Sequence, residues 1–202
     1  MSTISDAQKV QTQVDIAAMQ PGVAPPGFTF WRTGNGAAAE WQVVADPSAS
    51  AQKAIAQLSN DTTDYRFPLA VYQPISAKNV DVVVRFKAVA GTIDQAGGIA
   101  IRLTSPDGYY VVRANSLEDN VNLYGVVKGR RSQIRGADIK VAGNQWHTLG
   151  LRAVGDRFTV SFDGKMLFTA EDKTFANAGK VALWTKADSV THFDTIAITP
   201  LD

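Results

Sequence analysis

Apolar and polar residues alternate along most of the chain beyond residue 40, which predicts β-strands with one face on a core. Within 79–88, one strand face would carry Val80, Val82, Val84 and Phe86. The same period of two recurs in the segments 98–104, 109–115, 120–128, 146–154, 157–163, 165–170, 180–186 and 193–199. The spacing of these runs predicts about 10 to 13 short strands and little helix after residue 60.

Turn residues separate the runs. Asp163-Gly164 lies between RFTVSF and KMLFTA, and an Asp-Gly pair between two such runs is a strong signal for a β-hairpin. Asp107-Gly108 is a second turn of this kind. The pattern therefore predicts an all-β fold with two packed antiparallel sheets.

The amino-terminal segment has a different pattern. Residues 4–20 show some helical spacing, and Pro21-Gly22 would end any helix there. We expect residues 1–22 to form a short helix or arm, and residues 23–202 to form one sandwich domain.

Composition limits the classes of function. Of the 202 residues, 45% are hydrophobic and 19% are charged, which is enough apolar material for a sizeable core. Twenty basic residues against 19 acidic ones provide no general attraction for nucleic acid or an anionic membrane. No apolar run reaches the roughly 20 residues of a membrane span. Without cysteine there is no disulfide or thiol chemistry, and residues 1–20 do not read as a secretory signal as they stand.

Three stretches resemble one bacterial family. They are GGIAIRLTSPDGYYVVRANSLEDNVNLYGVVKGRR over 97–131 and QWHTLGLRAVGDRFTVSFDGKMLF over 145–168, followed by GKVALWTKADSVTHFDTIAI over 179–198. The stretches resemble the concanavalin A-like lectin/glucanase domain, related to laminin-G-like sandwiches, of the 3-keto-disaccharide hydrolase type. The resemblance covers about residues 23–200.

The resemblance implies a two-sheet jelly roll with one concave face that acts on or binds saccharides. It also implies a periplasmic or secreted location and, in some relatives, a structural calcium ion. Asp194 resembles the aspartate that holds calcium in those relatives. Only some members of the family carry the hydrolase activity, and function depends on the site rather than the fold. No cofactor is required by this interpretation.

Large polar and aromatic side chains fall on the polar sides of the middle strands. If those strands are neighbours, one sheet face carries Arg102, Arg113, Asn115, Asn122, Tyr124, Trp184 and Lys186. Sugars present hydroxyls and flat apolar ring faces, which planar polar groups and aromatic rings recognise. This set predicts a saccharide site in which Trp184 and Tyr124 stack on a sugar. The alternative is a solvated sheet face with a buried Trp184.

Three residues are candidates for a catalytic base: Glu118, Asp188 and His192. A 3-keto group acidifies the neighbouring C2 proton, so a single base would suffice for elimination. Glu118 lies beside Asp119, and we expect the pair in a turn, with Glu118 facing a ligand and Asp119 capping the turn. The E-x-D-x-x-E motif of laminarinase-type glycosidases is absent, which disfavours classical retaining hydrolysis.

The remaining candidates have simpler explanations. His147 alternates with the Leu149 and Leu151 face, which predicts a packed structural histidine. The basic run 129–135 is interpreted as a solvated hairpin tip that could contact an acidic saccharide, and it has too few aromatics for nucleic acid. Calcium prefers several oxygen ligands, which Asp194 could supply with the loop residues Asp46 and Asp61.

Three functions remain open at this point. The leading hypothesis is a carbohydrate-binding domain whose partner is a saccharide. The second is an enzyme that cleaves a disaccharide, including an oxidised 3-keto form. The third is a structural or interaction module that packs its polar sheet face on another chain. The oligomeric state is open in all three.

Overall fold

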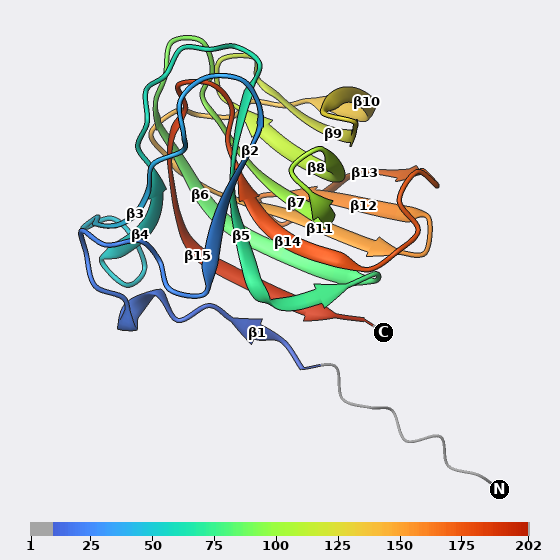
Figure 1. Cartoon of the computed structure of the whole chain (residues 1–202), viewed down its shortest axis with the longest axis horizontal. Coiled ribbons are helices and arrows are strands. Elements are labelled where there is room, and N and C mark those ends of the chain that lie inside the picture. Colours follow the sequence, from blue (N-terminus) through green and yellow to red (C-terminus); the bar gives the residue numbers. More distant parts are fainter. Residues whose placement is uncertain (1–9, 202) are drawn as a thin grey trace, which may run out of the picture.

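The computed structural model describes residues 10–201, where fifteen strands form two antiparallel sheets (Figure 1). The eight-stranded sheet contains, in spatial order, β13 (Lys165–Glu171), β12 (Arg157–Phe162), β11 (Trp146–Val154), β6 (Val80–Ala90), β15 (Val190–Pro200), β4 (Lys53–Gln57) and β3 (Trp41–Ala45), with β1 (Thr12–Gln13) on β15. The seven-stranded sheet contains β10 (Arg130–Asp138), β9 (Asn120–Val127), β8 (Gly108–Asn115), β7 (Ala96–Ser105), β14 (Gly179–Trp184), β5 (Arg66–Ala77) and β2 (Phe28–Gly34). The predicted all-β architecture is confirmed.

The strand count exceeds the predicted 10 to 13 for a local reason. Strand β2 follows two proline-rich turns and contains Phe30 and Trp31 in succession, so it shows little alternation. Strand β10 lies at the edge of its sheet and is polar on both faces, which hid it among turn residues.

The main core fills the space between the sheets. Val82, Val84 and Phe86 from β6 are fully buried there, as the alternation over 79–88 predicts. They pack in one cluster with residues of the opposite sheet such as Ile99 and Ile101. Burial of this apolar surface is the main force that holds the sheets together.

The predicted hairpin at Asp163-Gly164 is confirmed. The two residues link β12 to β13 with φ angles of 48° and 76°. Both angles are positive, as a two-residue type I′ turn requires, and Asp and Gly tolerate them best. Asp163 also accepts a hydrogen bond from the backbone N–H of Thr148 at 2.8 Å, which ties the turn to β11.

The amino-terminal arm packs on the sandwich. Strand β1 pairs with Ile198 and Ala197 of β15, and a 3-10 helix (Ile16–Ala18) follows it. The Asp15 side chain accepts a hydrogen bond from Ala18 N–H, while Ile16 is buried in the main core. The predicted helix over 4–20 is thus a single helical turn in its described part, and residues 1–9 lie outside the described range. In residues 10–201 no helix has the length and apolar character needed to span a bilayer.

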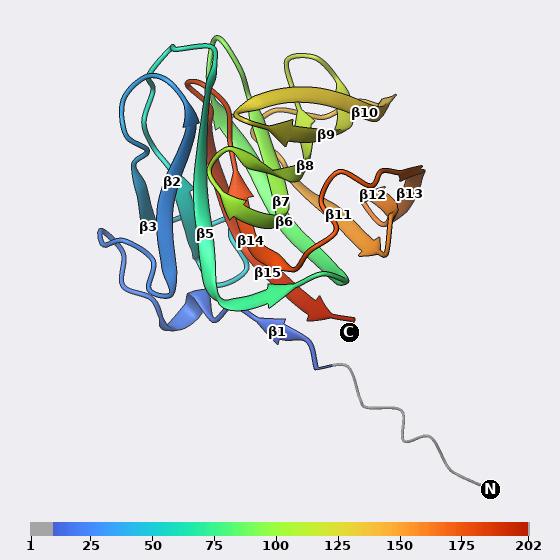
Figure 2. The ribbon, with the colours of Figure 1, turned by 45° about the vertical axis from the view of Figure 1, so that its right-hand side comes forward.

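The seven-stranded sheet is strongly curled. Strands β9 and β10 run almost across the direction of β5 (Figure 2). Five strand spacings separate β10 from β5, which would be about 24 Å in a flat sheet. Yet the guanidinium of Arg131 on β10 lies 5.0 Å from the ring of Phe67 on β5. The outer face of this sheet is therefore concave, and we call it the concave face.

Gly97 tests how tightly the two sheets are packed. A Cβ atom at Gly97 would lie 2.6 Å from Cδ2 of Phe86, a ring that is fully buried. We expect Gly97→Ala to lower the free energy of unfolding by about 1–3 kcal/mol, because the core must shift to admit the methyl group. Urea unfolding measures the change.

Gly125 provides the matched control in the same sheet. A Cβ atom there would meet only Cδ1 of Ile134, at an ordinary 3.9 Å. Gly125→Ala should therefore stay within about 0.5 kcal/mol of the parent protein. If Gly97→Ala lowered the free energy of unfolding no more than Gly125→Ala does, the sheets would not be tightly packed at Gly97.

Candidate functional site

The concave face carries most of the predicted site. Its buried polar residues, joined by hydrogen bonds and ion pairs, are Arg113, Asn115, Asn122 and Lys186, with Tyr124 and Trp184 in the neighbouring aromatic cluster. Val181 and Leu183 point the other way, into the main core, as the alternation in VALWTK predicts. Antiparallel pairing of β7, β8, β9 and β14 places these side chains together.

Arg113 on β8 is the centre of the polar group. Its Nη2 donates to Oε2 of Glu118 at 2.7 Å and to the Tyr124 hydroxyl at 3.0 Å. Its Nη1 donates to Oδ1 of Asn120 at 2.7 Å. The Tyr124 hydroxyl also accepts a hydrogen bond from Nδ2 of Asn122 at 3.1 Å. One guanidinium on β8 thus orients groups from β9 and from the turn between β8 and β9.

A second part of the network surrounds Lys186, which follows β14. Its Nζ lies 2.5 Å from Oδ1 of Asp64 and 3.0 Å from Oδ2 of Asp94. Asn115 Nδ2 donates to Oδ1 of Asp94 at 2.6 Å, which joins this pair to β8. Burial lowers the pKa of Lys186, but hydrogen bonds and charge from the two carboxylates outweigh it and raise the pKa. Burial also raises the pKa of Asp94 against the effect of Lys186, so both groups hold their protons more firmly.

Glu118 and Asp119 divide their roles in the turn between β8 and β9. Glu118 is half exposed beside Arg113. Burial raises the pKa of Glu118, but the hydrogen bond and charge of Arg113 outweigh it and lower the pKa. Asp119 instead accepts a hydrogen bond from Val141 N–H at 3.0 Å and pairs with Lys140 at 2.9 Å. The predicted turn position is confirmed, but the capping role of Asp119 is wrong: Oδ1 of Asn115 accepts hydrogen bonds from the N–H groups of Leu117 and Glu118 within the turn, and Asp119 ties the turn to the segment after β10.

Arg102 was placed on the wrong side by the alternation. Its φ angle is +54°, a bulge that reverses the pattern and sends Leu103 to the concave face. The Arg102 guanidinium donates to the carbonyls of Lys78, Phe175 and Gly155 at 2.6–2.9 Å. It also lies over Tyr110 of the main core. Arg102 therefore braces loops at one end of the sandwich.

Trp184 lies on the concave face, but its ring is fully buried. It packs 5.2 Å from the ring of Phe67, and its Nε1 donates to the Tyr109 hydroxyl at 3.3 Å. Gly98 and Arg113 close off the remaining side, since a Cβ at Gly98 would lie 3.2–3.3 Å from both Arg113 and Trp184. The predicted stacking of Trp184 on a sugar is therefore wrong for this conformation, because other side chains cover the ring.

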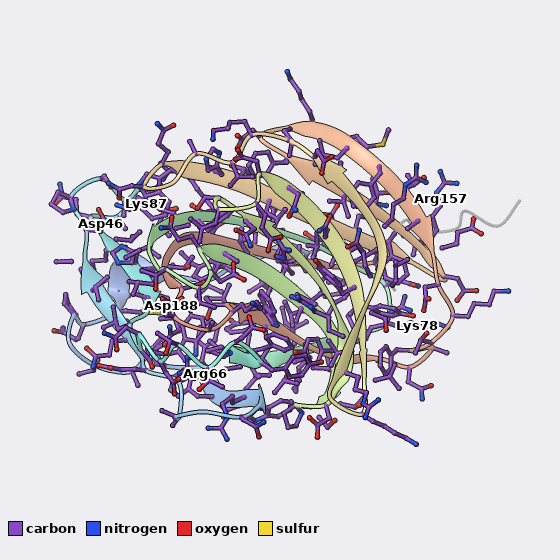
Figure 3. All side chains as sticks on the ribbon, turned by 90° about the horizontal axis from the view of Figure 1, so that it is seen from above. Asp46, Arg66, Lys78, Lys87, Arg157 and Asp188 are labelled. Atoms are coloured by element: carbon purple, nitrogen blue, oxygen red, sulfur yellow. The ribbon has the colours of Figure 1, made fainter. Side chains whose placement is uncertain are left out.

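The three candidate bases do not share one site. His192 Nδ1 lies 2.8 Å from Oδ2 of Asp46, which also pairs with Lys87 at 2.6 Å. Asp46 and Lys87 lie side by side at one end of the sandwich (Figure 3). Strand alternation places His192 and Lys87 on the outer side of the eight-stranded sheet, away from Glu118.

Asp188 anchors a loop. Its carboxylate accepts hydrogen bonds from the backbone N–H groups of Thr92, Ile93 and Asp94 and from the Thr92 hydroxyl, at 2.7–3.2 Å. Burial raises the pKa of Asp188, but these hydrogen bonds outweigh it and lower the pKa. Because the loop carries Asp94, Asp188 holds one partner of Lys186 in place.

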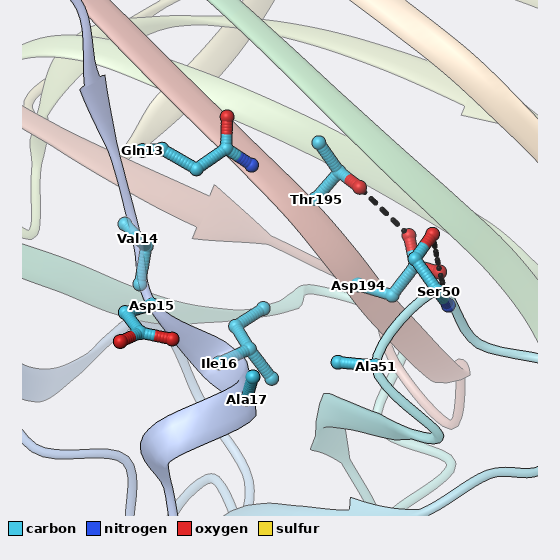
Figure 4. Close-up of a pocket in the computed structure, with 9 residues that line it drawn as sticks. All are labelled: Gln13, Val14, Asp15, Ile16, Ala17, Ser50, Ala51, Asp194 and Thr195. Atoms are coloured by element: carbon cyan, nitrogen blue, oxygen red, sulfur yellow. Dashed lines mark hydrogen bonds between the residues drawn. The ribbon is translucent and has the colours of Figure 1, made fainter.

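Asp194 borders a hollow of about 430 Å³ between the amino-terminal arm and the loop at Ser50 (Figure 4). Its carboxylate accepts hydrogen bonds from Ser50 N–H at 2.7 Å and from Arg85, so protein donors already neutralise it. Among residues 10–201 no three His, Asp or Glu side chains are placed to hold a metal ion. A structural calcium ion stays a prediction; Asp15 on the amino-terminal arm is the other carboxylate that lines the hollow.

His147 is a packed structural histidine, as predicted. It is 9% exposed and stacks on the ring of Phe162 at 4.9 Å. Its ring nitrogens lie 2.8 Å from Oδ2 of Asp163 and 3.0 Å from the carbonyl of Ala142. Both nitrogens are engaged by the hairpin and a neighbouring loop.

Sequence reasoning missed several residues of the concave face. Asp64 and Asp94 lie in loops without a recognisable motif, so no sequence signal marked them. Arg131 was assigned to a hairpin tip, although it shares a strand face with Gln133, which pairs with Tyr124. Alternation of side chains over 130–138 would have placed Arg131 on the concave face.

Comparisons with known proteins agree with this architecture. The sequence model of the family described as galactocerebrosidase, C-terminal lectin domain, matches residues 60–201. No curated protein matches the chain.

Solved structures share the fold at low sequence identity. The carbohydrate binding module CBM66 from Bacillus subtilis aligns with a TM-score of 0.67 and 18% identity, over 84% of this chain and 94% of that one. The β-glucanase of Bacillus licheniformis aligns with 0.62 and 12%, over 96% and 100%. Domain 4 of AbnA, an arabinanase of Geobacillus stearothermophilus, aligns with 0.56 and 17%, over 85% and 82%. The predicted lectin/glucanase type of jelly-roll sandwich is confirmed.

The loop anchored by Asp188 gives a stability prediction. Asp188→Asn should lower the free energy of unfolding at pH 7 by about 1–3 kcal/mol, because an amide oxygen replaces a carboxylate that accepts several hydrogen bonds. The folded pKa is below the unfolded value of about 3.9, so the carboxylate stabilises the fold above that pH. This contribution disappears as the pH falls toward the folded pKa.

Urea unfolding at pH 7 and at pH 3 measures both effects. The difference between Asp188→Asn and the parent protein should shrink at pH 3. Asp138→Asn, an exposed substitution on β10, should change stability little at either pH. A difference for Asp188→Asn that stays constant with pH would show that its ionisation does not stabilise the loop.

Proposed function

Because the chain belongs to the family of the galactocerebrosidase C-terminal lectin domain, we propose that it binds a carbohydrate on its concave face. The hydrogen-bonded group around Arg113 is the observation that carries this proposal. It presents a carboxylate, two amides and a phenol within one network, and these are the groups that recognise sugar hydroxyls.

The exposed edge of this network would make the contact with the sugar. The Glu118 side chain is 50% exposed and Asn120 is partly exposed, whereas Arg113 behind them is buried. Arg113 therefore serves to hold Glu118 and Asn120 in position. The Tyr124 hydroxyl accepts two hydrogen bonds, which leaves its own hydrogen to donate to a ligand.

The rings available for stacking differ from those predicted. Trp184 is fully buried, whereas Tyr65 is 39% exposed at the border of the same cluster. Its ring lies 4.8 Å from that of Phe67. We therefore assign the stacking role to Tyr65, with Phe67 and Trp184 as its support.

The structural neighbours support the same class of function. CBM66 is a carbohydrate binding module, and domain 4 of AbnA was solved in complex with arabinotriose. AbnA is an extracellular arabinanase, and we propose that this chain also meets its saccharide outside the cytoplasm, in the periplasm or after secretion.

Cleavage of a 3-keto-disaccharide is the second candidate, because Glu118 is an exposed carboxylate within the network. A general base works best with a pKa near the operating pH. Arg113 lowers the pKa of Glu118, which makes it a poor proton acceptor at neutral pH. His192 and Asp188 are held by other partners, so binding is the function that the geometry favours.

Glu118→Gln tests the binding proposal. A glycan array with neutral and acidic members would first identify a ligand, and calorimetry would then measure its dissociation constant. We expect the substitution to raise the dissociation constant about tenfold or more, because a hydrogen bond to a charged acceptor is worth about 1.5–3 kcal/mol. Equal rates of 3-keto-disaccharide cleavage by the parent protein and by Glu118→Gln would show that Glu118 is not the base.

Asp81→Asn is the matched control. Asp81 pairs with Arg152 at 3.1 Å on the eight-stranded sheet, and its side chain is 35% exposed. Its substitution should leave the dissociation constant unchanged. No binding to any glycan, or weakening by Asp81→Asn alone, would overturn the proposal.

A further inference from the structure

Arg131 occupies the aromatic half of the concave face. Its guanidinium lies 4.3 Å from the ring centre of Tyr124, 5.0 Å from Phe67 and 5.8 Å from Trp184. These three rings belong to β9, β5 and β14, so one cation contacts side chains from both halves of the curled sheet. The backbone N–H of Arg131 donates to the Tyr65 hydroxyl at 2.8 Å, which fixes β10 above the rings.

The charge of Arg131 has no anionic partner within residues 10–201. Its Nη1 atom is shielded from solvent and makes no hydrogen bond there. Arg113 differs, because Glu118 neutralises it, but its Nε atom is also shielded and without an acceptor. Cation–π contacts compensate only part of the cost of such unmet donors.

The surrounding hairpin adds positive charge. Strands β9 and β10 with their turn contain Lys128, Arg130, Arg131 and Arg135 against one acid, Asp138. Lys128 and Arg130 are exposed and form no ion pair in the described part of the chain. Arg135 lies over Phe168 of the main core and donates to the carbonyl of Thr169, so its charge faces away from the concave face. Arg131 is the cation that β10 directs onto the concave face.

We infer that the saccharide bound on the concave face is anionic, and that Arg131 binds its carboxylate or sulfate group. The inference rests on the proposed function and specifies its ligand. A guanidinium presents planar paired donors that match a carboxylate or a sulfate, and it stacks on aromatic rings at the same time. The three rings hold the Arg131 guanidinium in place, and its charge, which no carboxylate neutralises, attracts the anion.

The experiment compares glycans that differ only in charge. Trigalacturonic acid is titrated beside its trimethyl ester, and a carrageenan oligosaccharide beside its desulfated form. A panel of neutral oligosaccharides that includes arabinotriose is titrated in parallel. We expect at least one anionic probe to bind at least tenfold more tightly than its neutral counterpart, with an affinity that falls as salt rises. Which pair shows the difference distinguishes carboxylate from sulfate.

Substitutions locate the anion. Arg131→Gln should make the charged and neutral members of each pair bind with equal affinity, whereas Arg131→Lys should retain part of the preference for the charged member. Arg130→Gln removes the same charge from the neighbouring exposed residue and should have little effect. Thermal unfolding of all three variants checks that they fold.

The outcomes separate the two proposals. Binding of neutral glycans with no preference for either charged probe would overturn the anion assignment and leave the proposed function intact. A preference for the charged probe that survives Arg131→Gln would overturn the role of Arg131. Absence of binding to every charged and neutral probe would overturn both proposals.

Discussion

The curl of the seven-stranded sheet determines what its outer face can contain. In a flat sheet the side chains of β5 and β10 would be separated by about 24 Å. Here Arg131 reaches Phe67, and the Tyr65 hydroxyl donates to the carbonyl of Gly129 in the β9–β10 turn at 2.9 Å. Polar and aromatic residues that would face water are therefore packed together, and each must find a partner.

Burial explains how the charges on this face are arranged. Arg113 and Lys186 are almost fully buried, and each contacts carboxylates that remain partly exposed, Glu118 and Asp64 respectively. A buried charge is costly without a partner, so each of these buried cations lies against a more exposed carboxylate, and Lys186 has the buried Asp94 as a second partner. The result is a rigid polar edge, which suits recognition of hydroxyls better than proton transfer.

Arg131 differs from these residues because aromatic rings surround it in place of a carboxylate. The concave face thus combines a neutralised polar half around Arg113 with an aromatic half that carries the charge of Arg131. A saccharide that spans both halves would place its hydroxyls near Glu118 and Asn120 and its anionic group near Arg131. Selectivity for charge and binding of the sugar would then depend on different residues.

Sequence alone determined the class of this fold and many of its faces. The alternation over 79–88, the hairpin at Asp163-Gly164 and the packed His147 follow from local pattern, because period-two burial and turn geometry involve only neighbouring residues. Alternation along the strands also assigned one set of residues to a single sheet face: Arg113, Asn115, Asn122, Tyr124, Trp184 and Lys186.

Tertiary structure decided the rest. A single bulge at Arg102 reversed its direction, and the curl of the sheet buried Trp184 and brought Arg131, Asp64 and Asp94 into the site. Bulges and sheet curvature arise from packing between distant segments, which no local pattern encodes.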